Sequence, residues 1–253
     1  MRSVLVVLVL NIKSVMENNQ SALAVKYFLD NFPLDVLIDK VKPANKKEEL
    51  AHLYLGRLSE VLGVFDRLIK YEKYFKDFIP PVESGISESE AIEYHLRSYI
   101  EDFYILQERI RKIVQHLIKD IPNYGIQNPK DVEKALRHLS DQIHKRFEKI
   151  TSGLRRQHVH ERSISELDLV TGKFLSSIIS GEMPIPVGVN LDQDFIKSRH
   201  DEVLASTREK HIKQSQENSV SLRKMKEWFS ARFAYIFSSL NGDTIDGLNM
   251  DSE

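Results

Sequence analysis

The sequence predicts an all-α protein, and three observations indicate this fold class. Apolar residues recur at intervals of three and four through most of the chain, as on the buried face of a helix. No segment shows the alternation of apolar and polar residues that is typical of strands. Prolines and capping residues separate the periodic segments, where helices are expected to end and begin. With 253 residues, the chain can bury a substantial core.

The first helices are bounded by local signals. The first ends before Pro33 and the long third segment ends before Pro80 and Pro81, because proline lacks an amide donor and clashes with the preceding turn. Ser87 and Glu90 form the pattern of a capping box, in which each side chain binds the other residue's amide at a helix start. We expect helices over residues 22–32, 34–41, 50–75, 91–121, 129–154, 165–179 and 194–240.

The later helices carry less uniform patterns. Asn128 is a candidate N-cap, and Pro129 fits the first helical position, where its missing donor costs nothing. The last segment is nearly all polar over residues 206–219, which predicts either a solvent-bridging helix or a break. Aromatic residues near its end recur at helical spacing, and we interpret them as core residues in preference to a partner-binding surface. These residues are Trp228, Phe229, Phe233 and Phe237.

Bulk composition excludes several classes of protein and site. The 36 Lys and Arg residues nearly balance the 37 Asp and Glu residues, so binding of nucleic acid depends on a local patch. The absence of cysteine excludes disulfides and thiolate chemistry, and it agrees with a cytoplasmic location. The apolar run 4–10 is too short to cross a bilayer, so no membrane partner is expected. Met16 offers an alternative start, which would leave residues 1–15 outside the native protein.

The segment that most suggests chemistry is 153–162, where two histidines and three arginines lie close together. Imidazole exchanges protons near neutral pH, and guanidinium is a natural partner for phosphate. From Lys145 to Arg162, six Lys or Arg residues outnumber two Glu residues, which favours an anionic ligand. The alternative is a basic, solvated helix end without catalytic function.

Metal and cofactor sites are not expected. His158 and His160 can meet at a metal ion from an extended segment, with Glu161 as a third ligand. The surrounding Lys and Arg side chains repel a divalent cation, however, so we expect no metal there. No phosphate-binding glycine loop, dinucleotide fingerprint or serine nucleophile elbow occurs in the sequence. The remaining histidines are interpreted as surface or boundary residues: His52, His95, His116, His138, His144, His200 and His211.

Metal-free cleavage of RNA needs only an imidazole and a guanidinium in the right positions. The imidazole can deprotonate a ribose 2′-hydroxyl or protonate a leaving oxygen, while the guanidinium neutralises charge growing on the phosphate. In a continuous helix, Arg156 and His160 share one face. Arg155 and His160 diverge by about 140° around the helix axis unless the helix breaks between them. Both arrangements place a guanidinium within about one turn of His160.

At these residues the chain resembles the HEPN-domain family. The family's motif is an arginine followed by a histidine after four to six residues, and Arg155 and His160 fit with four between them. The aromatic-rich stretch 99–110 is similar to a core helix that is common in the family. The resemblance covers roughly residues 48–180 and implies an antiparallel helical bundle with extra N- and C-terminal helices.

The resemblance also implies a function. Active HEPN proteins are homodimeric, metal-independent endoribonucleases, and many act as bacterial toxins or abortive-infection effectors. In this chain it implies that His160 is the catalytic acid/base and that Arg155 stabilises the phosphate, with no cofactor. Arg156, His158 and Arg162 are expected to support RNA binding.

One departure from the family pattern supports a second interpretation. Active members usually carry a small polar residue after the arginine, whereas this chain carries Arg156. The alternative is therefore a non-catalytic HEPN-like interaction or scaffold protein, and an antitoxin or another protein is a candidate partner in either case. The expected organisation is an N-terminal helical extension (1–47), the HEPN-like bundle (48–180), a loop (181–192), a long C-terminal helical segment (193–240) and a flexible acidic tail (241–253).

Overall fold

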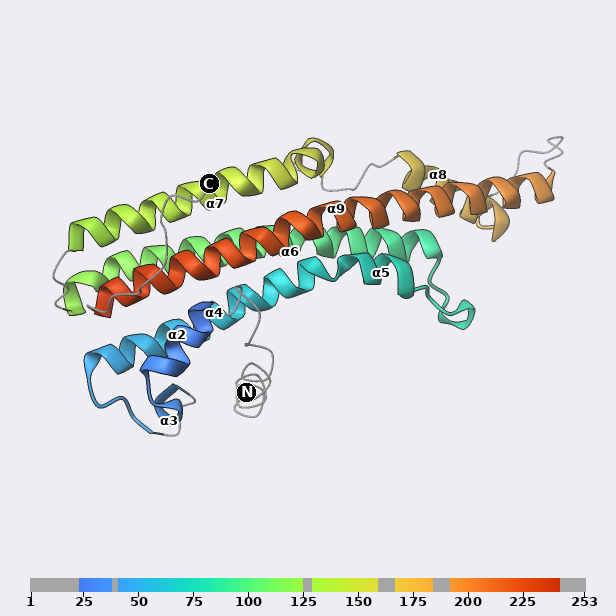
Figure 1. Ribbon diagram of the computed structural model, residues 1–253. Helices are drawn as coiled ribbons and strands as arrows, with labels where there is room; N and C mark the ends of the chain where they lie inside the picture. Colours follow the sequence, from blue (N-terminus) through green and yellow to red (C-terminus); the bar gives the residue numbers. More distant parts are fainter. Residues whose placement is uncertain (1–22, 38–40, 125–128, 159–166, 184–191, 242–253) are drawn as a thin grey trace. The chain divides into compact units, whose positions relative to one another are not determined.

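The protein is all-α, as the sequence predicts (Figure 1). A computed structural model describes residues 23–37, 41–124, 129–158, 167–183 and 192–241, and these ranges contain helices and no strand. Two compact units are present: unit 1 comprises 1–65, 105–147 and 222–253, and unit 2 comprises 66–104 and 148–221. The elements are α2 (Leu23–Asn31), α3 (Leu34–Leu37), α4 (Lys46–Ile69), α5 (Tyr71–Asp77), η3 (Val82–Ser84), α6 (Glu88–Asp120), η4 (Ile121–Tyr124), α7 (Pro129–His158), α8 (Leu167–Ile179) and α9 (Gln193–Asn241).

Helix starts follow the predicted signals. The capping box at the start of α6 is confirmed: the Ser87 amide donates to Glu90 Oε2 at 2.8 Å, and the Glu90 amide donates to Ser87 Oγ at 3.3 Å. Pro129 is the first residue of α7, where its missing amide proton leaves no hydrogen bond unmade. Local sequence therefore sets these two boundaries.

The predicted uninterrupted helix over residues 50–75 is wrong at one position. α4 ends at Ile69 and α5 begins at Tyr71. At this junction the Lys70 amide donates to the Arg67 carbonyl at 2.9 Å, and the Lys73 amide donates to the Lys70 carbonyl at 2.9 Å. These bonds span three residues in place of four, so the backbone tightens locally and the regular helix is interrupted.

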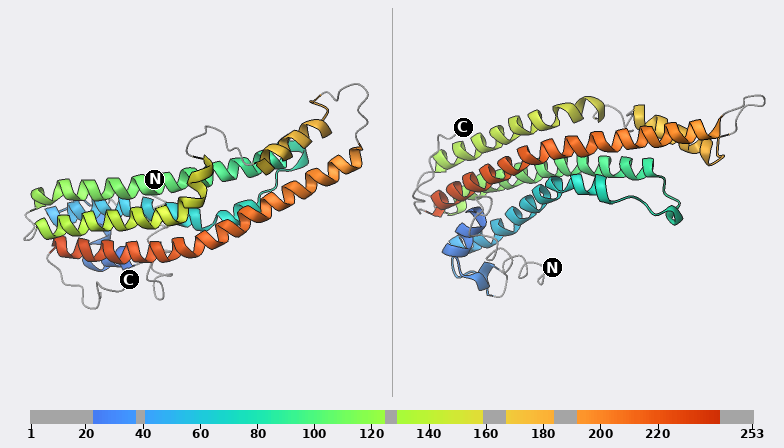
Figure 2. Two further views of the ribbon diagram at one scale, coloured as in Figure 1. Left: turned by 90° about the horizontal axis from the view of Figure 1, so that it is seen from above. Right: turned by 45° about the vertical axis from the view of Figure 1, so that its right-hand side comes forward.

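In unit 1, segments of α4, α6, α7 and α9 lie side by side around an aromatic core (Figure 2). The Phe237 ring on α9 is fully buried, and its centroid lies 4.5 Å from that of Phe28 and 6.2 Å from that of Tyr54. The Tyr54 hydroxyl donates to Asp120 Oδ2 at 2.7 Å and so links α4 to α6. Phe229 and Phe233 are also buried, which confirms the predicted core role of three of the four C-terminal aromatic residues.

The polar middle of α9 is continuous helix, which excludes the break that was one of the two predicted alternatives. Four of its polar residues recur at intervals of four and are buried within unit 2: Thr207, His211, Ser215 and Ser219. The Thr207 hydroxyl donates to the Val203 carbonyl at 2.7 Å, and the two serine hydroxyls likewise donate to carbonyls of their own helix. Small hydroxyl side chains can be buried in this way because the helix itself satisfies their hydrogen bonds.

Close packing accompanies this polar stripe in unit 2. A Cβ atom added to Gly172 on α8 would lie 2.9 Å from Leu204 Cδ2 on α9, so glycine permits the contact between these helices. The prediction that His211 is a surface or boundary residue is wrong: it is buried, and its ring stacks on Phe75 at 5.4 Å between centroids. Among the described helices, none combines the length and apolar character that a membrane crossing requires.

Candidate functional site

The predicted basic cluster begins in the last turns of α7. This helix forms because apolar residues recur at three- and four-residue intervals, and the buried members are Val132, Leu136, Leu139, Ile143 and Phe147. The helix continues through Gly153 and includes Arg155, Arg156 and His158. His160 and Arg162 lie outside the described residues.

The helical register of α7 fixes the relative positions of some residues of the cluster around the helix axis. Arg155 and His158 are three residues apart in α7, a spacing that places both positions on one helix face. The helix ends at His158, so the i,i+4 relation of Arg156 to His160 is not part of the described helix. The distance between Arg155 and His160 stays a prediction, as do the roles assigned to the five residues of the cluster.

One base that precedes the cluster on α7 has a packing role within unit 1. The guanidinium carbon of Arg146 lies 4.6 Å from the centroid of the Trp228 ring, a geometry that is favourable for a cation over an aromatic face. This contact connects α7 with α9. Lys145 and Lys149, by contrast, are exposed on α7 and extend the basic character of the helix toward Arg155.

A buried charge cluster in unit 2 connects α4, α5 and α6. The Asp102 carboxylate accepts hydrogen bonds from Arg67 Nη2 at 2.8 Å, Arg67 Nε at 3.2 Å and the Tyr71 hydroxyl at 3.2 Å. Asp102 is 7 % exposed. Burial, followed by the Asp102 charge and hydrogen bond, raises the pKa of Tyr71. The hydrogen bond to Asp102 raises the pKa of Arg67, so the guanidinium stays charged and the cluster is structural.

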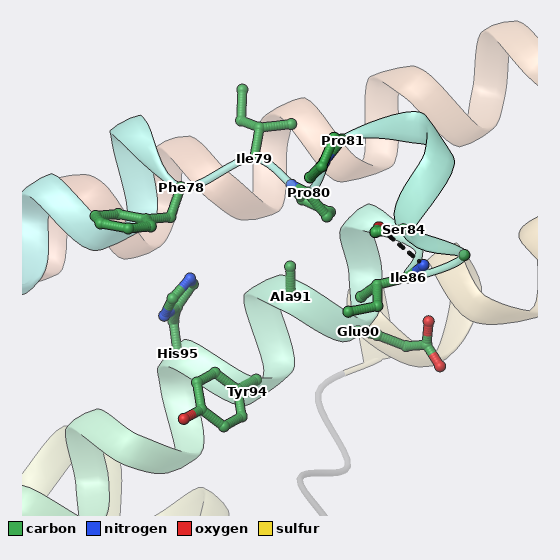
Figure 3. A pocket seen from close by; sticks show the side chains of 11 residues that line it. Phe78, Ile79, Pro80, Pro81, Ser84, Ile86, Glu90, Ala91, Tyr94 and His95 are labelled. Carbon is green, nitrogen blue, oxygen red and sulfur yellow. Dashed lines mark hydrogen bonds between the residues drawn. The ribbon is translucent and has the colours of Figure 1, made fainter.

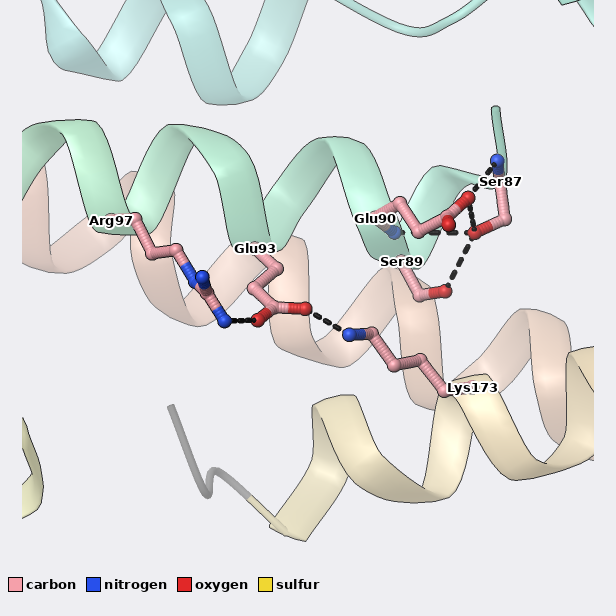
Figure 4. Close-up of polar contacts among 6 residues, drawn as sticks. All are labelled: Ser87, Ser89, Glu90, Glu93, Arg97 and Lys173. Carbon is pink, nitrogen blue, oxygen red and sulfur yellow. Dashed lines mark hydrogen bonds and ion pairs between the residues drawn. The ribbon is translucent and has the colours of Figure 1, made fainter. Parts of the chain in front are cut away.

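A second polar cluster in unit 2 connects α6 with α8 (Figure 4). The nearly buried Glu93 carboxylate forms ion pairs with Lys173 on α8 and with Arg97 one turn further along α6. Burial acts to raise the pKa of Glu93, but the hydrogen bonds and charges of Lys173 and Arg97 outweigh it, so the pKa is lowered. A carboxylate held ionised in this way is suited to joining helices and poorly suited to donating protons at neutral pH.

A pocket of about 580 Å³ lies within unit 2, between the end of α5 and the start of α6 (Figure 3). Apolar and aromatic side chains dominate its lining, and the rings of Phe78 and His95 lie next to each other at one side of it, with 6.1 Å between their centroids. Tyr94 and Ile86 also line the pocket and are 67 % and 55 % exposed. Large apolar side chains exposed together are typical of binding surfaces.

The sequence patterns do not indicate this pocket. Pro80 and Pro81 indicate only a helix end, and the sequence predicts that His95 is a surface or boundary residue. The available signal is the presence of Phe78, Ile79 and Ile86 in a turn segment rich in proline and glycine, where polar residues are usual. The pocket itself depends on the way α5 and α6 meet, which the sequence pattern does not reveal.

His95, which lines this pocket, has a pKa below its ordinary value. Burial lowers the pKa of His95, and a hydrogen bond with the Phe78 backbone offsets part of this effect. The ring is therefore neutral at pH 7, and it helps to fix the end of α5 against α6. Protonating it below its usual pKa would charge a half-buried group.

We expect His95 to make the protein less stable as the pH falls. Because the pKa is lower in the folded than in the unfolded state, the unfolded chain takes up the proton first as the pH drops below about 6.5. The stabilisation is present above that pH and is lost below it. The free energy of unfolding, measured with urea from pH 7.5 to 5.0, should fall less with decreasing pH for His95→Gln than for the wild-type protein. If the free energy of unfolding falls equally with pH in both proteins, His95 does not contribute to the pH dependence of stability.

Across the described part of the chain, no group of three or more His, Cys, Asp or Glu side chains is arranged to hold a metal ion. The described polar clusters are thus ion-pair networks, and the pocket at α5 and α6 is mainly apolar. In comparisons with known proteins, no protein-family model, curated protein or solved structure matches this chain.

Proposed function

We propose that the chain is a metal-independent endoribonuclease of HEPN type, with His160 as acid/base and Arg155 as the phosphate-stabilising group. The observation that supports this proposal is the concentration of bases along the last turns of α7 and in the sequence that follows this helix. From Lys145 to Arg162, six bases outnumber two acids in a chain whose net charge is −1. Arg155, Arg156 and His158 follow the exposed Lys145 and Lys149 along α7.

The proposed reaction uses the RNA's own 2′-hydroxyl as nucleophile. His160 removes the hydroxyl proton, and the 2′-oxygen attacks the adjacent phosphorus. The bond from phosphorus to the 2′-oxygen forms while the bond to the 5′-oxygen breaks, and the departing 5′-oxygen takes up a proton from water. Arg155 donates hydrogen bonds to the non-bridging oxygens, where negative charge grows in the transition state. The products are a 2′,3′-cyclic phosphate and a 5′-hydroxyl end.

The remaining residues and partners belong to the same proposal. Arg156, His158 and Arg162 bind phosphates of the RNA on either side of the scissile linkage, since guanidinium groups suit phosphate oxygens. Two copies of the chain bring two motifs into one cleft, and an antitoxin or another protein restrains the activity. The protein acts in the cytoplasm as a bacterial toxin or antiviral effector.

A basic helix end also has a simpler explanation. Cations near the C-terminus of a helix interact favourably with the helix dipole, so Arg155 and Arg156 stabilise α7 even in a non-catalytic interaction protein. The two explanations differ in what they predict for RNA. Only the nuclease requires an imidazole at position 160 and a 2′-hydroxyl in the substrate.

The test is cleavage of a structured RNA by the purified protein in excess EDTA. We expect cleavage that leaves 2′,3′-cyclic phosphate ends, because no metal takes part in the reaction. The matched substrate carries 2′-O-methyl groups and should remain intact, since it lacks the nucleophile. If both RNAs are cleaved alike, or if neither is cleaved, the proposed mechanism is wrong and the interaction protein is favoured.

A further inference from the structure

We propose that the apolar surface around the pocket at α5 and α6 binds a basic, amphipathic segment of another protein. This surface, which we call the α5–α6 surface, consists of Phe78, Ile79, Ile86 and Tyr94, all of them more than half exposed. It shares no residue with the basic cluster of α7, and the proposal does not depend on the proposed nuclease activity.

The α5–α6 surface is held in place by hydrogen bonds within its own segment. The Ser84 amide donates to the Pro81 carbonyl at 2.9 Å, and the Ile86 amide donates to Ser84 Oγ at 3.1 Å. Gly85 adopts a φ of 68°, a left-handed conformation that glycine reaches without strain. The capping box then fixes the start of α6. Exposure of the apolar side chains is therefore a property of an ordered turn.

The size and lining of the pocket suit an inserted apolar side chain. Its volume of about 580 Å³ falls within the range of roughly 300–1,000 Å³ that is usual for ligand pockets. Phe78 and His95 provide aromatic rings at one side of the pocket, and the small Ala91 side chain also lines it (Figure 3). Covering these side chains would remove apolar area from water, which favours association.

Charge around the pocket determines which partner fits. The stretch from Asp77 to Glu93 contains five acidic residues and no Lys or Arg. Glu88 pairs with Arg208, and Glu93 pairs with Lys173 and Arg97.

Two of these acids, Asp77 and Glu83, are exposed without an ion pair to any described residue, and a third, Glu90, is exposed while its Oε2 accepts the hydrogen bonds of the capping box. Within the described residues, no Lys or Arg forms an ion pair with Asp77, Glu83 or Glu90, and all three are exposed. The hydrogen bonds from the Ser87 amide and hydroxyl lower the pKa of Glu90, so its carboxylate is ionised at neutral pH. A partner that carries apolar side chains beside Lys or Arg therefore matches both the apolar character and the negative charge of this surface.

The same charges disfavour two other occupants. RNA phosphates and anionic lipids are repelled by the exposed carboxylates of Asp77, Glu83 and Glu90. A symmetric contact with a second copy through this same surface would set the acids of one copy against those of the other. A basic segment of a different protein is thus the occupant that the chemistry favours.

The test measures fluorescence anisotropy of labelled helical peptides mixed with the full-length protein. The first peptide has leucine and tryptophan on one face and lysine on the other; the second replaces lysine by glutamate, and the third replaces the apolar residues by serine. We expect the first peptide to bind at least tenfold more tightly than either of the others. Equal binding of the first and second peptides would refute the proposed charge match.

Variants locate the binding site. Tyr94→Ser and Glu83→Lys should each weaken binding of the first peptide several-fold, and combining them should weaken it at least tenfold. Phe195→Ser is the matched control, because Phe195 is 68 % exposed in unit 2 but lies outside the α5–α6 surface. Circular dichroism confirms that each variant is folded. If Phe195→Ser weakens binding as much as Tyr94→Ser, the assigned site is wrong.

Sedimentation of the wild-type protein and of Tyr94→Ser tests self-association. The proposal expects the same oligomeric state for both proteins. If the wild-type protein self-associates and Tyr94→Ser abolishes this, a second copy occupies the surface and the proposal is overturned.

Discussion

We expect the His160→Ala variant to cleave RNA about 100- to 10,000-fold more slowly than the wild-type protein in EDTA. This range is the usual contribution of a positioned group that transfers a proton in the transition state. Single-turnover kinetics with enzyme in excess are the appropriate measurement, because they report the chemical step and are insensitive to product release. The effect should lie in the cleavage rate, with RNA affinity nearly unchanged.

Two further variants make this result specific. His138 is exposed on α7, so His138→Ala removes an imidazole from the same helix and should leave the cleavage rate unchanged. Arg155→Lys keeps a positive charge but loses the planar fork of the guanidinium, so an intermediate rate is expected. Should His160→Ala match the wild-type rate while both proteins remain folded, the imidazole at this position has no catalytic role.

The second large effect is expected from Asp102→Ala, which should lower the free energy of unfolding by about 2 to 3 kcal/mol. The substitution leaves the Tyr71 hydroxyl and the Arg67 guanidinium without the acceptor that they share. Removing one partner of a buried ion pair usually costs more, but the Arg67 side chain is 47 % exposed and water replaces part of the interaction. Urea unfolding at pH 7 gives the difference directly.

A matched control for Asp102 is available on the same helix. Glu108 also accepts two hydrogen bonds from an arginine, with 2.8 Å between Arg111 Nε and Glu108 Oε2 and 2.7 Å between Arg111 Nη2 and Glu108 Oε1. This pair is exposed to solvent, so Glu108→Ala should not change stability measurably. If Asp102→Ala were as mild as Glu108→Ala, burial would not be what makes the Asp102 cluster important.

Much of the secondary structure could be predicted from the sequence because its causes are local. The capping box of Ser87 and Glu90 and the placement of Pro129 at a helix start depend on residues within one turn of each other. The break after Ile69 was missed, since its apolar residues keep the helical spacing while three-residue hydrogen bonds interrupt the helix. The polar stretch of α9 was harder to interpret, because its hydroxyls are satisfied by their own helix and can be buried.

For the candidate site, the sequence identified residue types and their spacing along one segment. The chemistry of imidazole and guanidinium indicated the segment 153–162, and the resemblance to the HEPN family selected Arg155 and His160 within it. The helix α7 supplies a helical register for Arg155, Arg156 and His158. The α5–α6 surface was not anticipated, because its residues are separated along the chain by a turn and a helix start. No periodic pattern links Phe78 with Tyr94.

The sequence by itself determined the all-helical class and several helix boundaries, because helical periodicity and capping act between residues a few positions apart. Only the tertiary structure decided that Asp102 is shared by Arg67 and Tyr71, and that His211 is buried against Phe75. It also decided that the turn before α6 and the first turns of α6 line an open, mainly apolar pocket. These features arise where helices meet, and contacts between distant segments leave no repeating signal in a single sequence.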